Sequence, residues 1–95
     1  MTNPATGPVA AEMERRLELA LAPTALTLID ESAHHQGHAG HDGRGESHFR
    51  LEIESAAFAG QSRVGRQRLV YAALGALMTG RVHALTIRAR APGEG

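Results

Sequence analysis

Histidines are the residues of this sequence whose type and spacing point most directly to chemistry. The chain contains six histidines, and four of them fall within eight residues: His34, His35, His38 and His41. Neutral imidazole is a common protein ligand for borderline transition metals. Two interpretations stay open, a metal site or a solvated polar loop. Spacing alone slightly favours the solvated loop, because no cysteine or carboxylate pattern completes a zinc motif.

His83 lies apart from this group, between Val82 and Ala84. If the expected strand around it alternates strictly, His83 shares a face with Leu85 and Ile87. Spacing alone favours a half-buried histidine that packs on the sheet edge. His83 becomes a ligand candidate only if the histidine-bearing loop folds over that edge.

Basic residues concentrate in the second part of the chain. Residues 1–62 hold four arginines and nine acidic residues, a net charge of −5, whereas residues 63–95 hold six arginines and one acid, a net charge of +5. Arg63, Arg66 and Arg68 open an expected helix, an arrangement suited to phosphate. The alternative is a solvated basic turn, and few aromatic residues are present to stack on bases.

Other features narrow the function class. With 95 residues and no cysteine, the chain is expected to form one domain with no disulfide and no thiolate metal site of its own. We find no carboxylate pair, phosphate loop or nucleotide-binding glycine motif, so we expect a protein that is not an enzyme. Neither a membrane span nor a signal peptide is recognisable, which favours the cytoplasm.

Hydrophobic periodicity predicts five elements between two tails. Residues 1–8 and 91–95 are expected to be tails around a domain over 9–90, with a long loop over 31–46. The expected elements are a helix over 8–22, strands over 24–30 and 47–54, a helix over 63–79 and a strand over 82–90. Since a helix separates the last two strands, the sheet should be mixed.

The same patterns predict which side chains are buried and where elements end. The first helix has a stripe of Val9, Met13, Leu17 and Leu21 (or Ala20), and the second a stripe of Val70, Leu74, Leu77 and Met78. Phe49, Leu51 and Ile53 form the inner face of the second strand. Ser62 is an expected helix cap, and Gly80 is expected to take a left-handed helix-end conformation.

Three stretches of this sequence resemble the BolA family. The first comprises residues 30–32, the histidine-bearing loop and Glu46-Ser47-His48-Phe49; the second runs from Phe58-Ala59-Gly60 to Tyr71; the third is Val82-His83-Ala84-Leu85-Thr86-Ile87. In order and spacing they cover the chain from about Val9 to Pro92. The resemblance implies an α+β domain similar to a class II KH domain, with a three-stranded mixed sheet and helices packed on one face (α-β-β-α-β).

The resemblance also implies a function and its partners. BolA-like proteins pair with monothiol glutaredoxins, and a [2Fe–2S] cluster can be bridged between the two proteins. The expected role is therefore an adaptor for iron–sulfur cluster trafficking or for iron and redox sensing. Its thiolates would come from glutaredoxin and glutathione, and we expect no cluster held tightly by the isolated chain.

Ligand positions follow from the same resemblance. The C-terminal histidine of the family maps onto His83, and a second ligand comes from the loop after the first strand. His35 and His38 both fit that position, and we prefer His38, while His34 and His41 fit less well. The resemblance thus favours His83 as a ligand over His83 as a packing residue.

DNA is the alternative partner that the resemblance implies. Some BolA proteins act as DNA-binding transcription regulators of stress response and morphology, through the turn and helix over 60–68. The family often has Arg-His-Arg in this helix, where this chain has Arg66-Gln67-Arg68. Both arginines are kept, so the departure puts in doubt only a role of the missing histidine.

Overall fold

The computed structural model describes residues 7–31, 48–80 and 82–94 of the chain. Its first element is helix α1, Pro8–Leu21, in which the predicted stripe is buried up to Leu21, whereas Ala20 is exposed. The helix ends one residue before the predicted Ala22, because Ala22 takes a left-handed φ of 44° and Pro23 cannot continue the helix.

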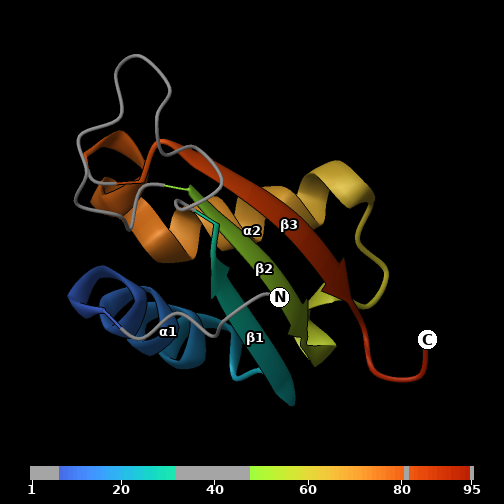
Figure 1. Ribbon diagram of the computed structural model, residues 1–95. Coiled ribbons are helices and arrows are strands. Elements are labelled where there is room, and N and C mark those ends of the chain that lie inside the picture. The colour runs from blue at the N-terminus through green and yellow to red at the C-terminus, as the bar shows by residue number, and fades with distance from the viewer. Residues whose placement is uncertain (1–6, 32–47, 81, 95) are drawn as a thin grey trace.

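Three strands form one mixed sheet in the order β1-β2-β3. Strand β1, Ala25–Asp30, is antiparallel to β2, His48–Glu54, and β2 is parallel to β3, Ala84–Arg90. Figure 1 shows β2 between the two edge strands. The parallel pair places the beginnings of β2 and β3 at the same end of the sheet, with His48 opposite Ala84.

The crossover from β2 to β3 contains two short 3₁₀ helices and one α-helix. The first 3₁₀ helix, η2, is Ala56–Phe58, and Phe58 is fully buried. Helix α2, Arg63–Leu74, is capped as predicted by Ser62, whose Oγ accepts a hydrogen bond of 3.0 Å from the Gly65 N–H. A second 3₁₀ helix, η3, Gly75–Thr79, leads towards β3.

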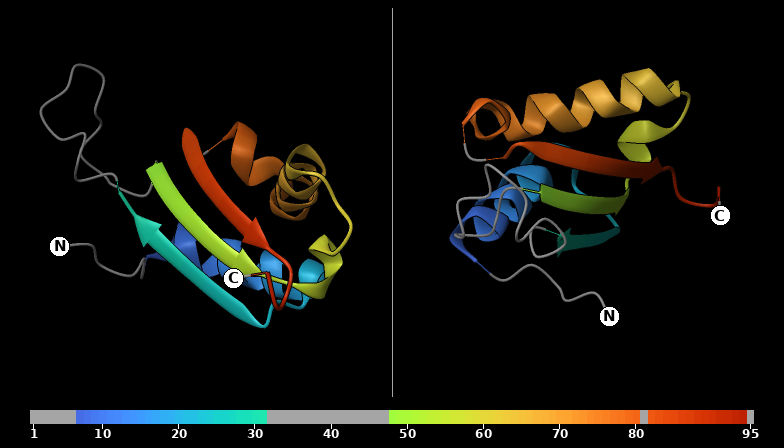
Figure 2. Two further views of the ribbon diagram at one scale, coloured as in Figure 1. Left: turned by 90° about the vertical axis from the view of Figure 1, so that its right-hand side faces the viewer. Right: turned by 45° about the horizontal axis from the view of Figure 1, so that its top comes forward.

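Both helices pack on one face of the sheet, and the core lies between them and the strands (Figure 2). Phe49, Leu51 and Ile53 of β2 are buried on this face, as the alternation predicted. From α1, Met13 and Leu17 have no exposed surface. The predicted α+β class, the mixed sheet and the one-sided arrangement of helices are therefore confirmed.

The end of the second helix differs from the prediction. The α-helix ends at Leu74 and not at Thr79, because Gly75 has a φ of 56° and the Arg16 guanidinium donates to the Leu74 carbonyl at 2.8 Å. As a result Leu77 and Met78 are only half-buried. Gly80 has a φ of −118°, so the expected left-handed glycine at that position was wrong.

The third strand starts later than predicted, at Ala84 instead of Val82. Val82 is buried and its N–H donates to the Leu77 carbonyl at 3.0 Å. Leu85 is the next residue packed against the core, so the strict alternation does not reach back to His83. His83 is consequently exposed and not half-buried.

Residues 91–94, expected to be part of a tail, contact the domain. Ala91 is buried in the core, and Glu94 forms an ion pair of 2.6 Å with Arg66. In the described part of the chain, no helix is long and apolar enough to cross a membrane.

Candidate metal centre and basic groove

The end of the sheet that carries His83 is also where the histidine-bearing segment joins the sheet. Strand β1 ends at Asp30, and the Glu31 N–H donates to the His48 carbonyl at 2.7 Å. Glu31 and His48, which flank the segment over 32–47, therefore lie next to each other at this end of the sheet. His34, His35, His38 and His41 lie outside the described residues, so only the two attachment points of their segment are placed.

His83 and His48 meet at this end of the sheet. The parallel register puts His48 opposite Ala84, one residue after His83. The two imidazole ring centroids are 6.2 Å apart, and the ring planes are inclined at 79°, an edge-to-face arrangement. His83 is exposed and His48 is half-buried, so both rings stand at the surface of the sheet end.

His48 was not among the ligand candidates that the sequence indicated. The signal that was available is topological: His48 begins one expected strand and His83 precedes another. If those two strands are parallel, their first residues lie at the same end of the sheet. The sequence predicted a mixed sheet but not the register that places His48 opposite Ala84, so the contact could not be derived.

The two imidazoles of His48 and His83 are the metal-ligating side chains that the structure brings into contact at this end of the sheet. No group of three or more histidine, aspartate or glutamate side chains placed to hold a metal ion occurs within residues 7–31, 48–80 and 82–94. Two imidazoles leave coordination positions open, so a group bound here would need further ligands from another molecule or segment.

The three arginines expected to bind phosphate differ in their surroundings. The Arg66 side chain is only 16% exposed and forms a bidentate ion pair with Glu94, at 2.6 and 2.7 Å. Its guanidinium also donates to the carbonyls of Gln61 and Ala89. Arg63 and Arg68 are exposed. Arg66 therefore binds the C-terminal residues to the rest of the domain through Glu94, while Arg63 and Arg68 face solvent.

The Arg66–Glu94 pair shifts the protonation of its carboxylate. Hydrogen bonds from the Arg66 guanidinium, and secondarily from the Ala91 N–H, lower the pKa of Glu94 to about 2. The carboxylate correspondingly raises the pKa of Arg66. The pair is therefore charged throughout the physiological range.

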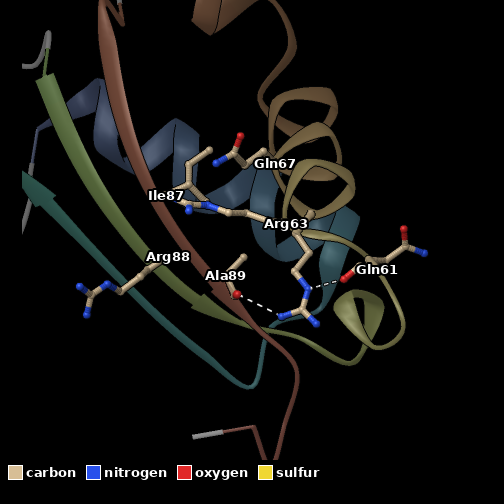
Figure 3. A pocket seen from close by; sticks show the side chains of 7 residues that line it. Gln61, Arg63, Gln67, Ile87, Arg88 and Ala89 are labelled. Carbon is tan, nitrogen blue, oxygen red and sulfur yellow. Dashed lines mark hydrogen bonds between the residues drawn. The ribbon is translucent and has the colours of Figure 1, made fainter.

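A groove of about 370 Å³ separates the beginning of α2 from β3. Its lining residues are Gln61, Arg63, Arg66, Gln67, Ile87, Arg88 and Ala89. Figure 3 shows Arg63 extending from α2 towards Ile87, whereas Arg88 points away from α2. The groove thus presents one solvent-facing guanidinium and two amide side chains, a surface suited to anionic groups.

Comparison with known proteins shows which class of domain has this fold. The sequence pattern of the family described as BolA-like protein matches residues 17–94. A protein of Sinorhizobium sp. described as "Uncharacterized protein in cobS 5'region" is 46% identical over 83 residues, which are 86% of this chain and 89% of that protein. BolA-like protein 1 of Pongo abelii is 46% identical over 90 residues, which are 95% of this chain and 63% of that protein.

Solved structures agree with the sequence comparison. The BolA domain of SufE1 from Arabidopsis thaliana matches with a TM-score of 0.84 and 42% identity, covering 96% of this chain and 100% of that domain. This chain belongs to the BolA family. It spans 63% of the length of its Pongo abelii relative and nearly the whole of the Sinorhizobium one.

Proposed function

We propose that this chain is an adaptor that binds a monothiol glutaredoxin and contributes ligands to a [2Fe–2S] cluster shared by the two proteins, for cluster trafficking or for iron and redox sensing. One observation carries the proposal: His83 is exposed at the sheet end where the segment over 32–47 is attached. A ligand on the surface is available to a second protein. The proposal includes the cytoplasm as the compartment, where thiols stay reduced.

The donor chemistry of the chain supports a shared cluster. Iron–sulfur clusters are usually held by thiolates, and this chain has no cysteine. The ligands that we propose from this chain are imidazoles, namely His83 and, as second ligand, His38 or His35, with His38 preferred. The thiolates would then come from glutaredoxin and from glutathione.

Anaerobic reconstitution tests this proposal. The chain alone, the host's monothiol glutaredoxin alone and an equimolar mixture, each with glutathione, are compared by visible absorption and circular dichroism. We expect no coloured cluster on the chain alone and, in the mixture, a spectrum distinct from that of glutaredoxin. A stoichiometric coloured cluster on the pure chain, or a mixture spectrum identical to that of glutaredoxin, would contradict the proposal.

DNA binding is the second candidate function, with a role as transcription regulator. Exposed Arg63 and Arg68, at the start of α2, favour it, together with the groove beside Ile87. Guanidinium contacts to phosphate carry no sequence information, so we propose weak binding with little preference among sequences. Duplexes of unrelated sequence, compared by fluorescence anisotropy at physiological salt, test it. Affinity for one site about 1,000-fold above a random duplex would contradict this weak, unselective mode.

A further inference from the structure

Two of the six histidines lie in the described part of the chain, and these two contact each other. His48 is the first residue of β2, and His83 immediately precedes the first residue of β3. Backbone pairing between His48 and Ala84 fixes the separation of their main chains. The pair therefore needs little ordering before it can bind a ligand, which lowers the entropic cost of binding.

The separation of the rings suits a single metal ion. A zinc–imidazole bond is about 2.0–2.1 Å long, so a bound ion lies roughly 3 Å from the centre of each ring. Two rings on one ion therefore have centres roughly 5 to 6.5 Å apart, depending on the angle at the metal. The observed 6.2 Å lies towards the long end of this range, so the two rings would approach each other by roughly 1 Å on binding a tetrahedral ion.

We propose that His48 and His83 together bind one divalent ion of the borderline class, such as Zn²⁺, Ni²⁺ or Cu²⁺, on the chain by itself. Imidazole nitrogen is a preferred ligand of all three ions. Water completes the coordination, because the described residues supply no third ligand to a common site. This site requires neither glutaredoxin nor an iron–sulfur cluster.

The proposal has a consequence for the adaptor function. His83 is also the ligand that we propose for the shared cluster, and one imidazole nitrogen cannot hold both. A divalent ion on the His48–His83 pair would therefore exclude the cluster from His83. Failure of the divalent site would leave the cluster proposal intact, since that proposal does not involve His48.

Zinc titration of the full chain tests the site. The reference variant carries asparagine at the four histidine positions of the segment over 32–47: His34→Asn, His35→Asn, His38→Asn and His41→Asn. With zinc chloride in calorimetry, we expect this variant to bind one ion per chain. Adding His48→Asn should weaken binding at least about tenfold, and adding His83→Asn should do the same, because each removes one of two ligands. Amide NMR spectra check that the variants stay folded.

Imidazole NMR on the reference variant gives a readout that needs no further substitution. Zinc should shift the ring resonances of both His48 and His83 together, with an endpoint at one equivalent. Loss of zinc binding in the reference variant, an unchanged affinity in His48→Asn, or zinc shifts confined to one of the two rings would overturn the proposal.

Discussion

At the scale of single residues, Arg66 shows how a charged side chain can serve structure where its sequence pattern predicts a ligand contact. The pattern of arginines at a helix start predicted phosphate binding for Arg63, Arg66 and Arg68 alike. Arg66 is instead engaged by Glu94 and by two backbone carbonyls. The sequence could not distinguish Arg66 from Arg63 and Arg68, because its partner Glu94 lies 28 residues away. The contact depends on how residues 91–94 pack against the domain.

Glu94→Gln should make stability less dependent on pH. The folded-state pKa of Glu94 is about 2, below the roughly 4.3 of an unfolded chain. The carboxylate therefore stabilises the fold fully above about pH 4.3, and this contribution disappears as the pH falls through about 2. In urea denaturation followed by circular dichroism, the wild type should exceed Glu94→Gln in stability at pH 7, and the difference should vanish near pH 2.

The matched control is Glu94→Gln in an Arg66→Gln background. Without the guanidinium, the effect of Glu94→Gln should become much smaller at pH 7. An equal effect in both backgrounds, or a difference that does not change with pH, would show that the ion pair does not stabilise the fold.

At the scale of elements, amphipathic periods predicted the order and type of the two α-helices and of the three strands but not the 3₁₀ helices η2 and η3, and burial confirmed the inner faces of α1 and β2. Two element ends were wrong by two residues or more. Helix α2 ends at Leu74 because Gly75 has a positive φ. Strand β3 begins only at Ala84, because the Val82 N–H donates to the Leu77 carbonyl. Both ends depend on contacts between segments, which a local period does not contain. His83 was identified through family resemblance, whereas its exposure and its contact with His48 follow from these ends and from the parallel register.

Ser55 joins three elements, and its loss should destabilise the fold. It is fully buried, and its Oγ donates to the Leu21 carbonyl at 2.5 Å, at the end of α1, and accepts from the Ala57 N–H at 3.1 Å. Ser55→Ala leaves both backbone groups without this partner, so we expect a loss of about 1–3 kcal/mol in the free energy of unfolding.

Thr79→Ala is the control for Ser55. The Thr79 hydroxyl also donates to a backbone carbonyl, that of Ala76 at 3.0 Å, but it is exposed, so water can replace it. We expect a change within about 0.5 kcal/mol by chemical denaturation. Similar losses in the two variants would mean that burial of Ser55 does not matter.

At the scale of the whole molecule, charge is divided along the chain, and the arginines that the structure describes within residues 63–95 lie on α2 and on β3. If duplex DNA binds here, each lost phosphate contact should reduce the salt slope of log K by about one. Arg63→Ala with Arg68→Ala should therefore lower the slope by about two, measured by anisotropy over a salt series. Both side chains are exposed, so the fold should be unaffected.

The glutaredoxin complex separates the two functions of this surface. The Arg63→Ala, Arg68→Ala double variant should keep the mixed-cluster spectrum, since its proposed ligands lie elsewhere. A double variant that keeps DNA affinity and loses the glutaredoxin complex would identify the basic surface as a protein-docking site.

His83 is exposed beside the attachment of the histidine-bearing segment, and the adaptor function depends on that side chain. The most direct measurement is therefore visible circular dichroism of the anaerobic complex with monothiol glutaredoxin, using His83→Ala and, as control, His34→Ala. We predict that His83→Ala abolishes the mixed-cluster spectrum while His34→Ala leaves it nearly unchanged. An unaltered spectrum with His83→Ala would contradict the assignment of His83 as a cluster ligand.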